Sequence, residues 1–134
     1  MKTRRTSSRG PRVLSTLILS IAAAAAVLAA TAPTRADIFV ANYGSSTIGQ
    51  YTDSGATVNA SLITGLGGIG TPFNGPSGIA VSRDGVNLFV ANFDMGTVGQ
   101  YTTAGATVNA TLITGLNGPS DIAVSGTSLF VAKS

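Results

Sequence analysis

An internal repeat is the feature of this sequence that most restricts its fold. Residues 38–66 align with residues 88–116 without a gap, and 20 of the 29 positions are identical. Four of the nine differences keep the chemistry, as in Tyr43 against Phe93. Repeats of this length are typical of supersecondary units that stack on one another. The duplication therefore predicts a repeated fold unit and not a repeated chemical site.

The spacing of the repeat changes along the chain. The segment GPSGIAV at 75–81 returns as GPSDIAV at 118–124, an offset of 43 residues instead of 50. The first copy therefore carries about seven extra residues, Gly67–Phe73. A third start follows at Leu129 with the letters LFVAK, so the repeat starts lie 50 and 41 residues apart.

Each repeat is expected to form four short strands. The apolar residues near the end of a repeat alternate with a period of two, as in a half-buried strand. Asp84-Gly85 separates two apolar runs, which is a strong hairpin signal. No helical periodicity occurs after residue 36. In the copy with all four, the expected strands are GIAV at 78–81, LFVAN at 88–92, TVGQYT at 97–102 and a last strand at about 106–114.

Four strands in each repeat of 41–50 residues predict an all-β chain built as a partial β-propeller. The expected strands over residues 37–134 amount to about two and a quarter four-stranded blades. A parallel β-solenoid is the alternative, because it is also rich in Gly, Thr and Asn. Its coils are usually about half this length and lack a hairpin turn at each strand junction. The propeller is the favoured prediction.

The motif GPSGIAV, followed by a turn and LFVAN, resembles the NHL-type propeller blade. It is also similar to secreted bacterial propellers of the streptogramin-lyase and gluconolactonase-like kind. The resemblance covers nearly all of residues 38–134 and implies blade architecture, but blades of this kind serve enzymes, ligand-binding proteins and scaffolds alike. The catalytic His and metal-binding Glu of the lyases and lactonases have no counterpart, since the chain contains neither residue type.

Residues 1–36 are predicted to be a secretory signal peptide, helical in its apolar part. Basic residues in the first twelve positions precede an uncharged apolar run, Val13–Ala32, and small residues then favour cleavage after Ala36. A retained N-terminal membrane anchor is the alternative, because the apolar run is nearly long enough to span a bilayer. We expect an exported protein, located in the periplasm, at the cell surface or outside the cell.

The charge of the chain is concentrated in this N-terminal segment. Six of the eight Lys and Arg residues lie in residues 1–36, which leaves Arg83 and Lys133 against five aspartates. A mildly acidic body with two cations lacks the basic surface that binds a phosphate backbone. Nucleic acid is therefore excluded as a partner.

The residue types for catalysis and metal binding are scarce. Without His or Cys, the usual zinc, iron and copper sites and imidazole-based triads cannot form. We expect no catalytic residue, no metal ligand and no cofactor, and hence a protein that is not an enzyme. Asp94 and Asp121 are expected in loops on one rim, where a calcium site is the alternative to a structural role.

One rim of the expected propeller gathers aromatic and amide side chains. The loop after each LFVAN strand and the loop before each GIAV strand should meet there. Such side chains suit carbohydrate stacking, whereas the alternative is that the aromatic rings pack on neighbouring blades and the Asn residues cap strands. The candidate ligand-binding residues are Asn42, Tyr43, Asn92, Phe93 and Asp94.

Two and a quarter blades do not complete a propeller, which typically has four to eight. We expect either further blades in a longer chain or self-association of copies to close the ring. The expected function is a non-catalytic binding or structural module with an unknown ligand, carbohydrate or protein. The alternatives are the N-terminal fragment of a propeller lactonase or lyase, and a two-blade lectin that oligomerises into a full propeller.

Overall fold

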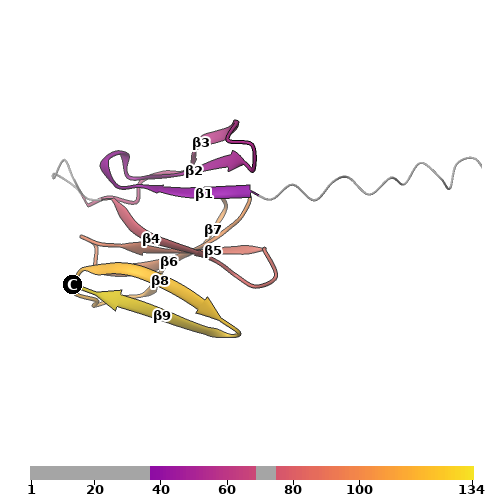
Figure 1. Cartoon of the computed structure of the whole chain (residues 1–134). Coiled ribbons are helices and arrows are strands. Elements are labelled where there is room, and N and C mark those ends of the chain that lie inside the picture. The colour runs from indigo at the N-terminus through magenta and orange to yellow at the C-terminus, as the bar shows by residue number, and fades with distance from the viewer. Residues whose placement is uncertain (1–36, 69–74) are drawn as a thin grey trace, which may run out of the picture. The chain divides into compact units, whose positions relative to one another are not determined.

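The computed structural model describes residues 37–68 and 75–134, and this part of the protein is all-β. Its strands form three antiparallel sheets (Figure 1). No helix of the described part is long and apolar enough to cross a membrane. The predicted signal peptide and residues 69–73 of the seven-residue insertion lie outside the described residues.

The middle sheet contains one complete repeat, with its strands in chain order. They match the four predicted strands within two residues at each end, so this prediction is confirmed. The turn with Asp84-Gly85 joins the first two strands, as expected for a hairpin. The strands are β4 (Pro76–Val81), β5 (Asn87–Asn92), β6 (Thr97–Thr102) and β7 (Thr107–Ile113).

The two other sheets contain parts of the same unit. The first sheet corresponds to β5, β6 and β7, and its register is that of the middle sheet: Val40 pairs with Gly49 as Val90 pairs with Gly99. A single 3₁₀ turn, η1 (Tyr43–Ser45), follows its first strand. The third sheet corresponds to β4 and β5. The strands are β1 (Asp37–Asn42), β2 (Thr47–Thr52) and β3 (Thr57–Ile63) in the first sheet, and β8 (Pro119–Ser125) and β9 (Ser128–Lys133) in the third.

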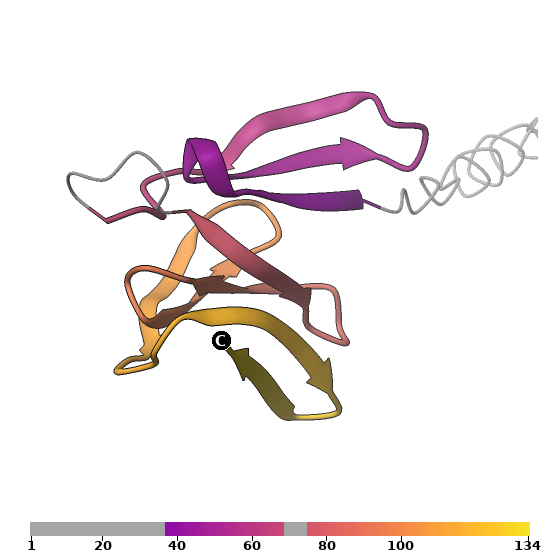
Figure 2. The ribbon, with the colours of Figure 1, turned by 60° about the vertical axis from the view of Figure 1, so that its left-hand side comes forward.

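The middle sheet is covered on both faces (Figure 2). Successive side chains of a strand point to opposite faces, so Leu88 and Val90 lie on one face of β5 and Phe89 and Ala91 on the other. We call the Leu88 side face A and the Phe89 side face B. Face A packs on the first sheet and face B on the third.

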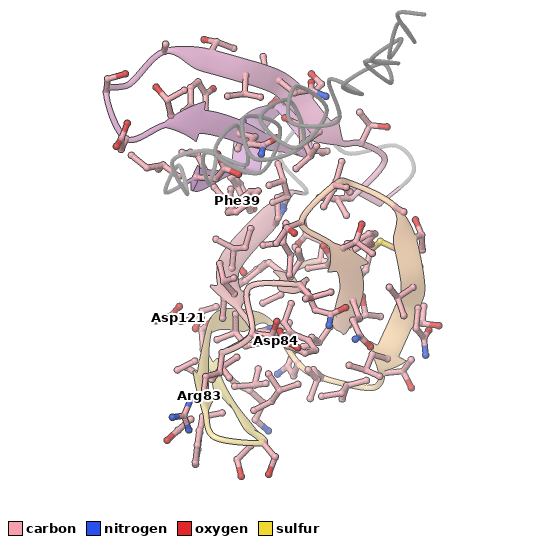
Figure 3. The ribbon with its side chains drawn as sticks, turned by 90° about the vertical axis from the view of Figure 1, so that its right-hand side faces the viewer. Phe39, Arg83, Asp84 and Asp121 are labelled. Atoms are coloured by element: carbon pink, nitrogen blue, oxygen red, sulfur yellow. The ribbon has the colours of Figure 1, made fainter. Side chains whose placement is uncertain are left out.

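The two packed interfaces use the same repeat positions. On the first sheet, the residues against face A include Phe39, Ala41, Ile48, Ile63 and Leu66, which are the counterparts of Phe89, Ala91, Val98, Ile113 and Leu116 on face B. Leu62 also packs here, whereas its counterpart Leu112 is 37% exposed. On the third sheet, the residues against face B are Ile122, Leu129 and Val131, the counterparts of Ile79, Leu88 and Val90 on face A. Each sheet thus packs its face B on face A of the next one, and the repeated sequence encodes a repeated interface. Figure 3 labels Phe39 at the first of these interfaces.

The letters GQY, present in both long copies, have a packing explanation. A Cβ added to Gly99 would lie 2.7 Å from Cε2 of Tyr101, and one added to Gly49 would lie 2.8 Å from Cε2 of Tyr51. Each tyrosine ring therefore folds back over the glycine two residues before it. A ring placed in this way shields the strand backbone that glycine leaves bare.

Candidate functional site

The predicted site residues lie at one end of the sheets, which we call the loop end. Pro76, at the start of β4, pairs with Asn92, at the end of β5, so the loop after β5 and the segment before β4 lie at the same end. Close contacts join neighbouring sheets here: Gly75 lies against the backbone of Tyr43, and Gly118 lies against the ring of Phe93.

The two asparagines stabilise the turns that follow their strands. Nδ2 of Asn92 donates to Oγ1 of Thr97 over 3.2 Å, and Nδ2 of Asn42 donates to Oγ1 of Thr47 over 3.3 Å. Asn92 is only 2% exposed, and its Oδ1 has no hydrogen-bond partner in the described part of the chain. The Asn92 side chain is therefore held inside the fold, whereas Asn42 is half-buried, and the bond to a threonine is the contact that both copies share.

The two aromatic residues, Tyr43 and Phe93, differ in their exposure to solvent. Phe93 is half-buried, and a Cβ on Gly118 would lie 3.1 Å from its Cε2 atom, so the ring packs on the backbone that leads into β8. Gly118 also has a φ of 53°, in the left-handed region where glycine is favoured. Tyr43 belongs to η1 and is 39% exposed. Of the two rings, Tyr43 is the more accessible to a ligand.

A pocket of about 340 Å³ lies beside Phe93 at the loop end. It contains two of the predicted site residues, Phe93 and Asp94; Asn42, Tyr43 and Asn92 are not among its lining residues. The other lining residues are Met95, Gly96, Leu116, Asn117, Gly118 and Ser134.

Sequence reasoning missed Asn117 and Ser134 as pocket residues. The neighbours of Asn117 are both held at the loop end. The amide of Leu116 donates to the carbonyl of Gly96 over 2.9 Å, and Gly118 follows Asn117 directly. The backbone amide of Ser134 donates to the carbonyl of Gly118 over 3.1 Å. The shortness of the connection between β7 and β8 was the one signal that could have placed Asn117 here.

The expected loop position of Asp121 is wrong. Asp121 is the third residue of β8, pairs with Ala132 of β9, and accepts a hydrogen bond at Oδ1 from the amide of Ile122. It does not line the pocket that contains Asp94. Among residues 37–68 and 75–134 there is no group of three or more His, Cys, Asp or Glu side chains able to hold a metal ion.

Asp84 and Arg83 lie at the opposite end, in the turn between β4 and β5 (Figure 3). Oδ1 of Asp84 accepts hydrogen bonds from the Ser82 hydroxyl and from the amide of Val86. The Ser82 bond and, after it, the Val86 bond lower the pKa of Asp84 below its ordinary value. These contacts are those of an aspartate that holds a turn.

The described residues define an all-β repeat protein of stacked antiparallel sheets, with a small pocket at the loop end. Comparison of the chain with protein-family models, with curated proteins and with solved structures finds no match.

Proposed function

We propose that this chain forms β-propeller blades of an exported, non-catalytic protein. It acts as a binding or structural module at the cell envelope or outside the cell. The observation that supports the proposal is the repeated interface: face B of each sheet lies on face A of the next, and most of the repeat positions that pack at one interface also pack at the other. Stacking of four-stranded sheets by one recurring contact is what propeller blades require.

The loop end is the proposed binding surface. Tyr43 is partly exposed in one loop, and Phe93 and Asp94 line one pocket in the corresponding loop, so the loop end presents aromatic rings and an aspartate. Asn42 and Asn92 have a supporting role, because their amides hold the turns that carry Tyr43 and Phe93. A carbohydrate fits this chemistry, since sugar rings stack on aromatic faces and their hydroxyls donate to carboxylates.

Self-association into a complete propeller, as in a two-blade lectin, is the second candidate function. It is favoured by the apolar residues that remain exposed on the outermost sheets, among them Ile38 and Phe130. An enzymatic role receives no such support from the contacts described above.

Export and binding can be tested on one preparation. The full chain is expressed in an exporting bacterial host, and the released product is identified by its mass. The proposal predicts an N-terminus at Asp37 and a β-rich far-UV circular dichroism spectrum. Retention of the full chain in the cytoplasm, or a helical spectrum, would contradict it.

Binding is then measured by co-sedimentation with purified peptidoglycan sacculi. Tyr43→Ser should reduce the bound fraction without loss of β structure, because Tyr43 is partly exposed in η1. Val108→Ser, a change at an exposed position of β7, is the matched control and should bind as the unmodified chain does. Equal binding by all three proteins would remove the loop end from the proposal.

A further inference from the structure

We propose that a second copy of this chain docks head to tail on the first. Face B of the β8–β9 sheet of one copy packs on face A of the β1–β3 sheet of the other. The inference rests on the proposed stacking of propeller blades and names the partner that continues it.

The β1–β3 sheet has an uncovered face A. Ile38 and Val40 are the counterparts of Leu88 and Val90, which are 0% exposed in the middle sheet, yet they are 46% and 39% exposed. Tyr51, the counterpart of the buried Tyr101, is only half-buried. The apolar side chains are present on this face, and the neighbouring sheet that would cover them is missing from the described part of the chain.

The β8–β9 sheet has an uncovered face B. Phe130 is 59% exposed and Ala132 is exposed, whereas their counterparts Phe89 and Ala91 pack on the third sheet. A hollow of about 510 Å³ opens on this sheet, with Ala123, Phe130 and Ala132 among its lining residues. The uncovered surface thus offers an exposed aromatic ring beside a concavity.

These two uncovered faces are the two halves of an interface that already exists inside the chain. Phe39, the counterpart of Phe130, packs against the cluster that contains Leu88 and Val90. The same geometry would bring Phe130 of one copy onto Ile38 and Val40 of another. No new kind of contact is needed, because each residue would meet the type of partner that its counterpart meets within one chain.

The close approach of β4 and β8 favours a second copy over a further complete repeat as the occupant of face B. A Cβ on Gly78 would lie 2.8 Å from Cα of Asp121, so β8 comes this near only because position 78 has no side chain. Asp121 occupies the same position in its repeat as Gly78 does in the repeat before. The Cβ of Asp121 therefore lies where the first strand of a following repeat would have to pack. The β1–β3 sheet avoids this conflict, because its described strands correspond to β5, β6 and β7 and include no first strand.

A contact between two different faces is heterologous, and it forms a ring when its rotation closes. The described residues of each chain form three sheets, so a closed pair of copies would contain twice that number of described sheets, within the four to eight blades of closed propellers. We therefore expect a complex of two copies.

The mass of the complex is measured by sedimentation velocity on the full chain, expressed in an exporting host and purified in the form that the host releases. The unmodified chain should sediment with the mass of two copies at micromolar concentration. Val40→Glu and Phe130→Glu should each weaken association at least about tenfold, because each would bury an unpaired carboxylate. Val108→Glu is the matched control: Val108 is 53% exposed, lies on the middle sheet, and should leave the mass unchanged.

Mixing the two blocked variants tests the head-to-tail arrangement. The Val40→Glu chain retains an intact face B and the Phe130→Glu chain an intact face A, so their mixture should form a one-to-one complex and nothing larger. An interface of like faces would instead let one of the variants pair with itself, which would overturn the proposal.

A covalent readout does not depend on whether the charged variants fold. The chain contains no cysteine, so Val40→Cys and Phe130→Cys each introduce a single thiol. Oxidation of the mixture should yield mixed disulfides in preference to those of either variant alone. A β-rich protein that remains monomeric at about 100 μM would overturn the docking of copies and the self-associating candidate, and would leave the proposed binding or structural module standing. Loss of the β-rich spectrum in the unmodified chain would instead contradict that proposed function.

Discussion

The hydroxyl of Ser77 lies 2.6 Å from the carbonyl oxygen of Pro119 and so connects β4 to β8 across two sheets. The same Oγ is 3.2 Å from the carbonyl of Ala91 in its own sheet. A hydroxyl has one proton to donate, so we assign the Ser77 proton to the shorter contact, with the carbonyl of Pro119. This contact is a polar link at an interface that is otherwise built from apolar side chains.

Ser77→Ala should lower the free energy of unfolding by about 1 kcal/mol, the usual contribution of one intramolecular hydrogen bond. Urea denaturation at a fixed protein concentration measures this, since association would make the midpoint depend on concentration. Ser120→Ala changes the counterpart hydroxyl in β8 and should have a smaller effect. Equal losses from the two variants would show that the Pro119 carbonyl is not a significant partner.

Gly78→Ala should destabilise the protein by about 1–3 kcal/mol, the usual cost of forcing extra volume into a packed site. The added Cβ would meet backbone atoms of Asp121 and Ile122, which cannot turn aside as the end of a side chain can. Gly44→Ala is the control, because a Cβ there has no heavy atom within 4 Å. Thermal unfolding followed by circular dichroism compares the two variants, and similar melting temperatures would contradict the close approach.

Gly99→Ala should cost more stability than Gly49→Ala, although both glycines lie under a tyrosine ring. Tyr101 is 5% exposed and belongs to the packed cluster on face A, so its ring has no room to move away from a new methyl group. Tyr51 is half-buried and can shift toward solvent. We expect a difference of about 1 kcal/mol or more between the variants in urea denaturation. The reverse order would mean that the uncovered face A of the first sheet is more tightly packed than the exposure of Tyr51 indicates.

Stability should fall as the pH rises above about 10, in part because of Tyr101. Burial raises the pKa of the Tyr101 phenol above its ordinary value of 10.0. The unfolded chain therefore releases this proton at a lower pH than the folded chain does. The unfolded state is thereby stabilised relative to the folded state over the pH window that begins at the unfolded pKa. Melting temperatures between pH 8 and pH 11 measure the decline, which Tyr101→Phe should make shallower. An unchanged slope would contradict the burial of the phenol as its cause.

The strands could be predicted closely from the sequence, because alternating apolar residues and hairpin turns are local signals. The pairing of β4 to β7 in chain order follows from the short turns between them. Which faces meet depends on three-dimensional spacing, and the packing of Phe39 against the cluster that contains Leu88 identifies them.

The candidate site was less predictable for a physical reason. Asn92 and Phe93 are neighbours in sequence, yet one is buried and bonded to Thr97 while the other lines a pocket. Whether a residue at a strand end turns inward depends on the next sheet, which repeat spacing alone does not reveal. Asp121 illustrates the same limit: the turn residues before it pointed to a loop, but pairing with β9 extends the strand through it.

The segments that follow β3 and β7, the last strands of their sheets, are each held by a backbone hydrogen bond before the connection to the next sheet begins. The amide of Leu66 donates to the carbonyl of Ser46 over 3.2 Å, and the amide of Leu116 donates to the carbonyl of Gly96 over 2.9 Å. The connections that follow differ by seven residues in length, yet both sheets are secured in the same manner. Sequence can therefore be lengthened between Leu66 and Gly75 with little thermodynamic penalty, which makes this junction a suitable graft point for a displayed peptide or an affinity tag.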